Sequence, residues 1–250
     1  SPFGVGAIYD LGNESLIAHD ISKWTKSCRG EKISLKRLSK KLRLREFRMP
    51  EVIVNPWSKY KPKIPFTRFP RWLFCSKCRS LKYFPKIKVV DPENAPRCEN
   101  PKCGHNVLTP MRFVAACKAG HLQDIDWHWW AHSRKKGNVV ENCQVRDKLK
   151  FRDIPNRGGG LGSLEIYCGA CNERRDLSDL FNPQSMSRIG LSCNGKQPWQ
   201  RPDEVQEKEK CSEELRVAQR GASNIYFPVV ISALDIPSEK KDNLDMDQEI

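Results

Sequence analysis

Apolar and polar residues alternate at the start of the chain with the two-residue period of a β-strand. Val5 and Tyr9 belong to this alternation, which breaks at the pair Gly12-Asn13 and then resumes. A Gly-Asn pair between two alternating runs is typical of a tight turn. The pattern therefore predicts a β-hairpin over residues 3–18.

A helical period follows the hairpin. Ile33, Leu35, Leu38 and Leu42 recur at roughly the spacing of one helix face, and lysines and arginines fill the positions between them. Ser34 stands where it could cap the first turn. We expect a short, basic, amphipathic helix here.

Prolines and short apolar runs dominate the remaining chain. Five prolines between residues 50 and 70 prevent regular structure and favour an extended segment. Further elements are predicted as short strands at 111–116 and 164–167, a tryptophan-rich helix at 124–133, and a strand-like run at 225–234 that Pro228 interrupts.

Polar stretches separate these elements. Residues 157–162 (RGGGLG) form a predicted loop, and this loop lacks the Gly-Lys-Ser/Thr that completes a phosphate-binding P-loop. Residues 201–214 are charged and predict a helix or a mobile insertion. Beyond Pro237 the chain is acidic with almost no apolar content, which indicates a tail or linker.

The composition offers little material for one large hydrophobic core, because only 38% of the 250 residues are apolar and 30% are charged. The eleven cysteines offer an alternative source of stability. Their count is odd, their spacing is repeatedly Cys-x-x-Cys, and no signal-peptide pattern opens the chain, so metal sites are favoured over disulfides. We expect a reducing, cytoplasmic setting and no membrane, since no apolar run approaches the roughly 18 residues that span a bilayer.

The positive charge is concentrated in one region. Residues 23–90 hold 21 lysines or arginines against three acids, a net charge of +18, whereas the whole chain carries +14. A basic block with interleaved aromatic residues favours a polyanionic partner such as DNA. The candidate contacts are Lys36, Arg37, Lys40, Lys41, Arg43, Arg45, Arg68 and Arg71; the alternative is a solvated basic face over core aromatics.

Three groups of four residues are candidate metal ligands. The first is Cys75, Cys78, Cys98 and Cys103, in which two short loops each offer two thiolates. A redox Cys-x-x-Cys pair is the alternative, but the βαβ setting of that motif is missing. Another group is Cys168, Cys171, Cys193 and Cys211, whose second pair is assigned by elimination.

The group between them is Cys117, His121, His132 and Cys143. His128 lies four residues before His132, so both share a helix face and either could supply the ligand. His132 is preferred because it needs a shorter return loop to Cys143. Cys28, the odd cysteine, is expected to be a small buried residue.

These sites predict an α+β protein made of small zinc-stabilised modules of the ribbon or knuckle type, with short β-hairpins, few helices and much irregular loop. Three Zn²⁺ ions per chain are expected, although thiolate quartets also accept iron. The predicted parts are an N-terminal segment at 1–70, zinc modules at 71–115, 116–160 and 161–235, and an acidic tail or linker at 236–250.

Four longer motifs resemble one family. They are RFPRW at 68–72, RFVAAC at 112–117 followed by His121-Leu122-x-Asp124, WxxWAH at 127–132, and LRVAQRGASNIYFP at 215–228. Together they resemble DrmB, the helicase-associated component of the DISARM anti-phage defence systems. The likeness runs from the first hairpin to Leu234, and in this family the histidine at the position of His132 recurs.

The resemblance implies an accessory protein that works with DrmA, a superfamily 2 type helicase, and with DNA. Family members are usually longer and carry a C-terminal helicase-associated domain, so this chain is expected to be a fragment or one half of a split protein. We expect a non-catalytic helicase partner that contributes DNA binding.

Two other functions stay open. A zinc-dependent nuclease or deaminase would need an open coordination position, and the deaminase signature is missing from the sequence. Asp124 and Asp126, near His121, are the acids to consider for such chemistry. A scaffold that does not touch DNA would leave the basic block without a role.

Overall fold

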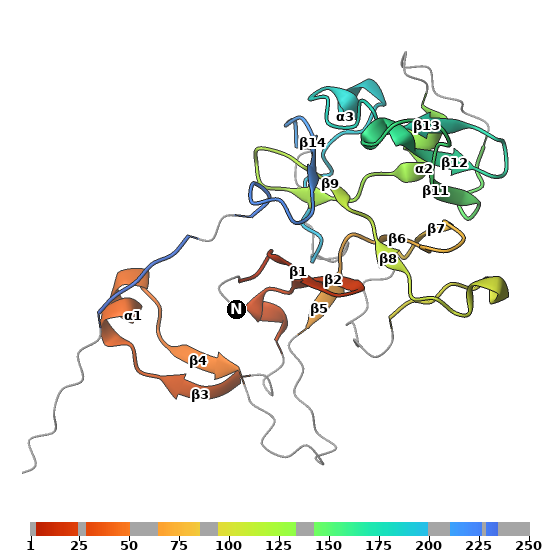
Figure 1. The fold of residues 1–250 in the computed structure, drawn as a ribbon. Helices are drawn as coiled ribbons and strands as arrows, with labels where there is room; N and C mark the ends of the chain where they lie inside the picture. Colours follow the sequence, from red (N-terminus) through yellow and green to blue (C-terminus); the bar gives the residue numbers. More distant parts are fainter. Residues whose placement is uncertain are drawn as a thin grey trace, which may run out of the picture. The chain divides into compact units, whose positions relative to one another are not determined.

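The computed structural model describes residues 4–24, 29–50, 65–85, 95–133, 143–199, 211–226 and 229–234. These residues form small antiparallel sheets joined by irregular loops, with few and short helices (Figure 1). The predicted α+β class is therefore confirmed. The chain divides into two compact units, residues 1–24 with 64–228 and residues 25–63 with 229–250. The finer division into zinc modules stays a prediction.

The predicted N-terminal hairpin is present in the larger unit. Strands β1 (Ile8–Leu11) and β2 (Glu14–Ala18) pair antiparallel, and β5 (Phe66–Arg68) pairs with the other edge of β2. Gly12 takes a φ of 62° in the turn between β1 and β2, a conformation that glycine adopts without steric cost. All five residues of β2 are buried, so this strand anchors the sheet.

A second sheet holds the loops of the first cysteine group. Its strands β6 (Trp72–Phe74), β7 (Leu81–Tyr83) and β8 (Thr109–Pro110) are arranged in the order β7-β6-β8. The 3₁₀ turn η4 (Pro101–Cys103) begins with a proline, which suits a first helical position because its missing N–H is not needed there. Asn100 caps this turn by accepting a hydrogen bond from the amide of Lys102.

A third sheet joins segments that lie far apart in the sequence. Strand β9 (Phe113–Ala116) pairs with β10 (Leu122–Gln123) on one side and with β14 (Arg216–Gln219) on the other. The predicted strand at 111–116 is thus present with a later start. Because β14 comes from the end of the larger unit, this sheet ties that end back to its middle.

The fourth sheet consists of β11 (Leu149–Asp153), β12 (Leu164–Cys168) and β13 (Arg174–Asp176), all antiparallel. The 3₁₀ turn η5 (Leu161–Ser163) leads into β12. One face of this sheet belongs to the main core, to which it contributes Phe151 and Ile166.

The main core is built around the tryptophan-rich helix. Helix α2 (Trp127–His132) is shorter than the predicted 124–133, and the Asp126 carboxylate caps it by accepting from the amide of Trp129. Trp127 and Trp130 are fully buried, as expected for core tryptophans. The short helix α3 (Ser185–Arg188) adds Met186 to the same core.

The smaller unit contains β3 (Arg29–Ile33), α1 (Lys36–Leu42) and β4 (Phe47–Pro50), with β3 and β4 paired antiparallel. Helix α1 is the predicted basic helix and buries none of its residues. The expected Ser34 cap is wrong, because Leu35 occupies the cap position and no side chain bonds the first turn.

Some of the elements predicted from the sequence differ from the structure, and others lie on residues that the structure does not describe. The strand-like run at 225–234 forms no strand in its described residues. In the predicted loop 157–162, residues 157–160 are irregular and residues 161–162 belong to η5. Cys28, residues 51–64 of the proline-rich segment, residues 201–210 and the acidic tail lie outside the described part of the chain. Among the described residues, no helix is both long enough and apolar enough to cross a membrane.

Candidate metal centres

The described residues contain three groups of four cysteines and histidines, and in each group the ligand atoms lie within 4.8 Å of one another. The twelve members are the twelve residues that the sequence singles out. The groups are Cys75, Cys78, Cys98 and Cys103 (cluster A); Cys117, His121, Cys193 and Cys211 (cluster B); and His132, Cys143, Cys168 and Cys171 (cluster C).

Cluster A matches its predicted membership and has a small apolar core of its own. The turn after β6 carries Cys75 and Cys78, and the Cys75 amide donates to the carbonyl of Ser80 at 2.9 Å. The sulfur atoms of Cys78 and Cys98 are 3.6 Å apart. The turn therefore points two sulfur atoms at the pair supplied by the loop around η4.

The thiols of cluster A influence one another. Burial raises the pKa of Cys78, but hydrogen bonds from the Ser80 hydroxyl and amide outweigh it and lower the value to about 6. Burial, followed by the neighbouring thiols of Cys78 and Cys98, raises the pKa of Cys103 to about 12. Burial also opposes ionisation of Cys75, but backbone hydrogen bonds from Cys78 and Lys77 outweigh it and lower the pKa of Cys75. Two thiolates therefore form readily, whereas the other two thiols need a cation to offset the accumulated negative charge. Metal binding to cluster A therefore releases protons.

Cluster B is assembled by the third sheet. The β9–β10 turn carries Cys117 and His121, whose Sγ and Nδ1 atoms are 3.4 Å apart. Cys211, just before β14, brings its sulfur to 4.0 Å from that of Cys117 because β14 pairs with β9. Cys193 follows α3 and completes the group; burial raises its pKa to about 12.

Cluster C joins the end of α2 to the fourth sheet. His132 Nε2 lies 3.1 Å from the sulfur of Cys171, and the sulfur atoms of Cys143 and Cys168 are 3.8 Å apart. His132 Nδ1 is 2.6 Å from the carbonyl oxygen of His128. A carbonyl at that nitrogen fixes the tautomer in which Nε2 is free to bind a metal.

The structure places His132 rather than His128 in cluster C. The His128 ring stacks beside that of His132, with centroids 4.2 Å apart, and is buried. Burial, followed by the neighbouring His132, lowers the pKa of His128. His128 thus supports the ligand ring and contributes its backbone carbonyl.

The predicted partners of clusters B and C are wrong. The sequence grouped Cys117 and His121 with His132 and Cys143, as neighbours along the chain. The structure instead joins the first pair to Cys193 and Cys211, and joins His132 and Cys143 to the pair at 168 and 171. The physical reason is the β9–β14 pairing, which brings Cys211 beside Cys117 and which the sequence pattern did not reveal.

The donor sets suit a structural metal. Thiolate and imidazole groups prefer zinc or iron to the hard cations, and four protein donors complete a tetrahedron. Each cluster provides four donors, so each could hold a metal ion with no coordination position left for a substrate. The donor atoms alone do not distinguish zinc from iron.

The acids considered for catalysis have structural partners. Asp124 accepts hydrogen bonds from the amide of Arg71 at 2.7 Å and from its Nε at 2.8 Å. Burial raises the pKa of Asp124, whereas the Asp124 charge, overcoming burial, raises the pKa of Arg71. A raised pKa favours the neutral form of Asp124 but the charged form of Arg71. The two hydrogen bonds to the carboxylate favour the ionised pair. Asp126 caps α2 and pairs with Arg146 at 3.0 Å.

The predicted DNA contacts fall into two groups. Arg68 binds both carboxylate oxygens of Glu14, at 2.7 and 2.8 Å, and Arg71 is held by Asp124. Both arginines therefore have a structural role in the larger unit. The other six are exposed and lie on α1 or in the turn after it, namely Lys36, Arg37, Lys40, Lys41, Arg43 and Arg45.

Comparisons with known proteins agree with the motifs. The family described as "Domain of unknown function (DUF8724)" matches residues 1–227. The DISARM protein DrmB of Bacillus paralicheniformis is 32% identical over 242 residues, which cover 95% of this chain and 39% of that protein. The chain thus spans about two fifths of the length of this relative. We conclude that the chain belongs to the DUF8724 family and is a relative of the DISARM protein DrmB.

Proposed function

We propose that this chain is a non-catalytic, zinc-stabilised component of a DISARM-type defence complex that docks on a superfamily 2 type helicase and contributes DNA binding through α1. The likeness to DrmB over 95% of the chain carries the assignment to a defence system. Helicase and DNA are the partners that this likeness suggests.

The closed clusters support a structural role for the metal. A catalytic zinc keeps three protein ligands and an open position for water, whereas each cluster here has four candidate ligands. The ions would hold the loops around β6, β9 and β12 in fixed positions. The chain would then bind its partners through loops that the metal ions hold rigid.

The surface of α1 supports DNA binding. Lys36, Arg37, Lys40 and Lys41 occupy a seven-residue helix whose side chains are all at least partly exposed, with no acidic residue in its first turn. A dense row of exposed cations releases counterions when it meets phosphates, and this gain makes binding steeply dependent on salt.

The test is charge reversal of these four residues to Glu, measured by fluorescence anisotropy with single-stranded and forked DNA over a range of salt concentrations. If all four contact phosphates, the slope of log affinity against log salt becomes shallower by about 3 on single strands. The control reverses four exposed cations of the larger unit, Lys102, Arg112, Lys118 and Arg188, for the same change in net charge. Equal effects from both variants would contradict a specific role for α1.

The same cations also make protein contacts, which favours a second use of this surface. Arg37 donates to the carbonyl of Leu234 at 3.1 Å, and Lys41 donates to that of Ser232 at 3.3 Å. Mixing each variant with the helicase separates the two uses. Loss of helicase binding with unchanged DNA affinity would make the chain a scaffold rather than a DNA-binding component.

A further inference from the structure

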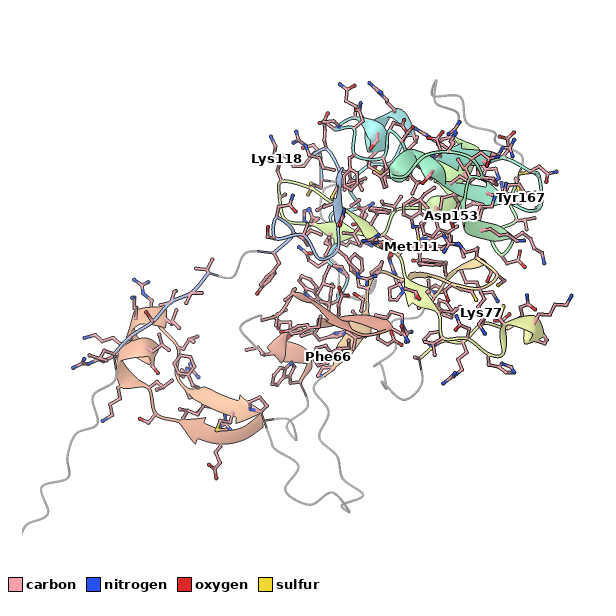
Figure 2. The ribbon with its side chains drawn as sticks, viewed as in Figure 1. Phe66, Lys77, Met111, Lys118, Asp153 and Tyr167 are labelled. Carbon is pink, nitrogen blue, oxygen red and sulfur yellow. The ribbon has the colours of Figure 1, made fainter. Side chains whose placement is uncertain are left out.

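The face of the β11–β12–β13 sheet that lies opposite the core carries charged residues and one tyrosine. Strand pairing places Lys150, Tyr167 and Arg174 in one row across the three strands. The next row holds Arg152, Glu165 and Asp176. Residues two apart on a strand share a face, so both rows lie on the side opposite the core residues of the sheet. Figure 2 marks Tyr167 on β12 and Asp153 at the end of β11.

A cation and an aromatic ring are stacked on this face. The guanidinium carbon of Arg152 lies 3.8 Å from the centre of the Tyr167 ring. Glu165 accepts from Arg152 Nε at 2.6 Å, and Tyr167 donates its hydroxyl hydrogen to Asn172. Each member of the stack is therefore held by a second contact. The stack is set in place before any ligand arrives, which reduces the entropy cost of binding.

A pocket of about 700 Å³ adjoins the stack. Its charged lining consists of four arginines and three acids, namely Arg152, Arg157, Arg174, Arg175, Asp153, Glu165 and Asp176. The volume falls within the range of roughly 300 to 1,000 Å³ that small-molecule sites occupy. The pocket is therefore large enough for a base with its sugar and phosphate.

The charge around this pocket favours an anion. The three acids of the lining already have ion-pair partners. Asp176 pairs with Arg157 at 3.2 Å and Glu165 with Arg152 at 2.6 Å. Asp153 pairs with Arg79 at 3.5 Å. Arg174 is exposed and has no ion-pair partner among the described residues. Lys150, next to Tyr167 in the same row, is exposed as well but lies outside the pocket lining.

We propose that this pocket binds one nucleotide of single-stranded DNA, with the base on the Arg152 guanidinium, which the Tyr167 ring supports from behind, and the phosphate at Arg174. Planar guanidinium and aromatic groups accept any base on their faces, and cations beside them hold the backbone. A duplex cannot use this site, because its bases are already stacked on one another. The inference rests on the proposed function for the presence of DNA and adds a second site, in the larger unit.

The experiment compares a 12-residue oligothymidine with an abasic strand of the same length, by anisotropy on the metal-loaded chain. Arg152→Lys keeps the charge beside Glu165 but removes the planar group that stacks. We expect this variant to bind oligothymidine about tenfold more weakly, a typical loss for one stacked base, and to bind the abasic strand as before. Arg174→Ala should weaken both strands and reduce the salt slope by about 0.7, the value for one phosphate contact.

Arg112→Ala is the matched control, because it removes an exposed arginine of the larger unit that does not line the pocket. Metal content and unfolding temperature equal to those of the parent chain show that each variant is folded. Equal affinity of the parent for both strands, or unchanged oligothymidine binding by Arg152→Lys, would overturn the proposal. Binding of thymidine monophosphate as tight as that of the strand would also overturn it, by assigning the pocket to free nucleotides.

The two proposed DNA-binding surfaces, α1 and the pocket, can be refuted independently of each other. If charge reversal of α1 abolishes DNA binding while Arg152→Lys binds DNA normally, the proposed function stands and the pocket is not a DNA-binding site. If only the pocket variants lose DNA affinity, the pocket is a DNA-binding site and α1 is not.

Discussion

Single backbone positions next to the cysteines determine the shape of the metal-binding turns. Arg79 follows Cys78 with a φ of 63°, and Asn172 follows Cys171 with a φ of 65°. This left-handed region is unfavourable for most residues, and asparagine tolerates it better than arginine does. Arg79 has compensating contacts, because its guanidinium lies 5.2 Å from the centre of the Phe74 ring and 4.9 Å from that of Phe151.

The two neighbouring histidines of α2 should respond differently to substitution. We expect His132→Ala to lose one metal ion per chain, because its Nε2 is a ligand atom of cluster C. His128→Ala should retain full metal content and lose only packing against the His132 ring. Native mass spectrometry of both variants gives the metal count directly. The reverse result, with metal lost only from the His128 variant, would contradict the assignment.

Two glycines of the N-terminal segment adopt positive φ angles, and they differ in their surroundings. At Gly6 the backbone has a φ of 89°, and an added Cβ would come within 2.9 Å of the Trp199 ring. Gly12 has a φ of 62° but open space around it. The first position therefore combines backbone strain with a side-chain clash, whereas the second has strain alone.

This difference predicts the result of two matched substitutions. Gly12→Ala should lower the free energy of unfolding by about 1 kcal/mol, the cost of a left-handed alanine. Gly6→Ala should lower it by about 1 to 3 kcal/mol more, because the tryptophan ring must move. Thermal or urea unfolding of the metal-loaded protein measures both. Equal losses would show that Trp199 does not pack against this turn.

Local elements could be predicted from the sequence, because their signals are local. The Gly12-Asn13 pair indicated the hairpin, and the spacing of leucines indicated α1. Pairing between distant strands carries no such signal, so β14 beside β9 was not foreseen. The exposed row on β11 to β13 was missed for the same reason, since it forms only when three separate segments come into register.

At the scale of the whole molecule, the twelve candidate ligands could be identified from residue type and spacing, but their grouping could not. Cys-x-x-Cys spacing brings together only the two members of a pair. Which pairs share an ion depends on the sheets, and clusters B and C pack against one common core. Tertiary structure therefore decides which pairs of ligands share one metal ion.

Double variants test the grouping. Cys143→Ala with Cys168→Ala removes two ligands of cluster C and should cost one metal ion per chain, the same as either single change. Cys143→Ala with Cys117→Ala affects clusters B and C and should cost two. The grouping by sequence neighbours predicts the opposite counts. Metal analysis of the four variants, with the total protein measured independently, decides between the two arrangements.

Cluster C lies between the two halves of cluster B along the chain, since its members span 132–171 while cluster B reaches from Cys117 to Cys211. A ribosome releases the chain from its N-terminus, so the ligands of cluster C are all free before Cys193 emerges. Cys117 and His121 meanwhile wait for Cys193 and Cys211, which emerge after all of cluster C. These two donors therefore stay without their partners for the time needed to synthesise about a hundred residues, and during that time they are open to oxidants or to a wrong metal.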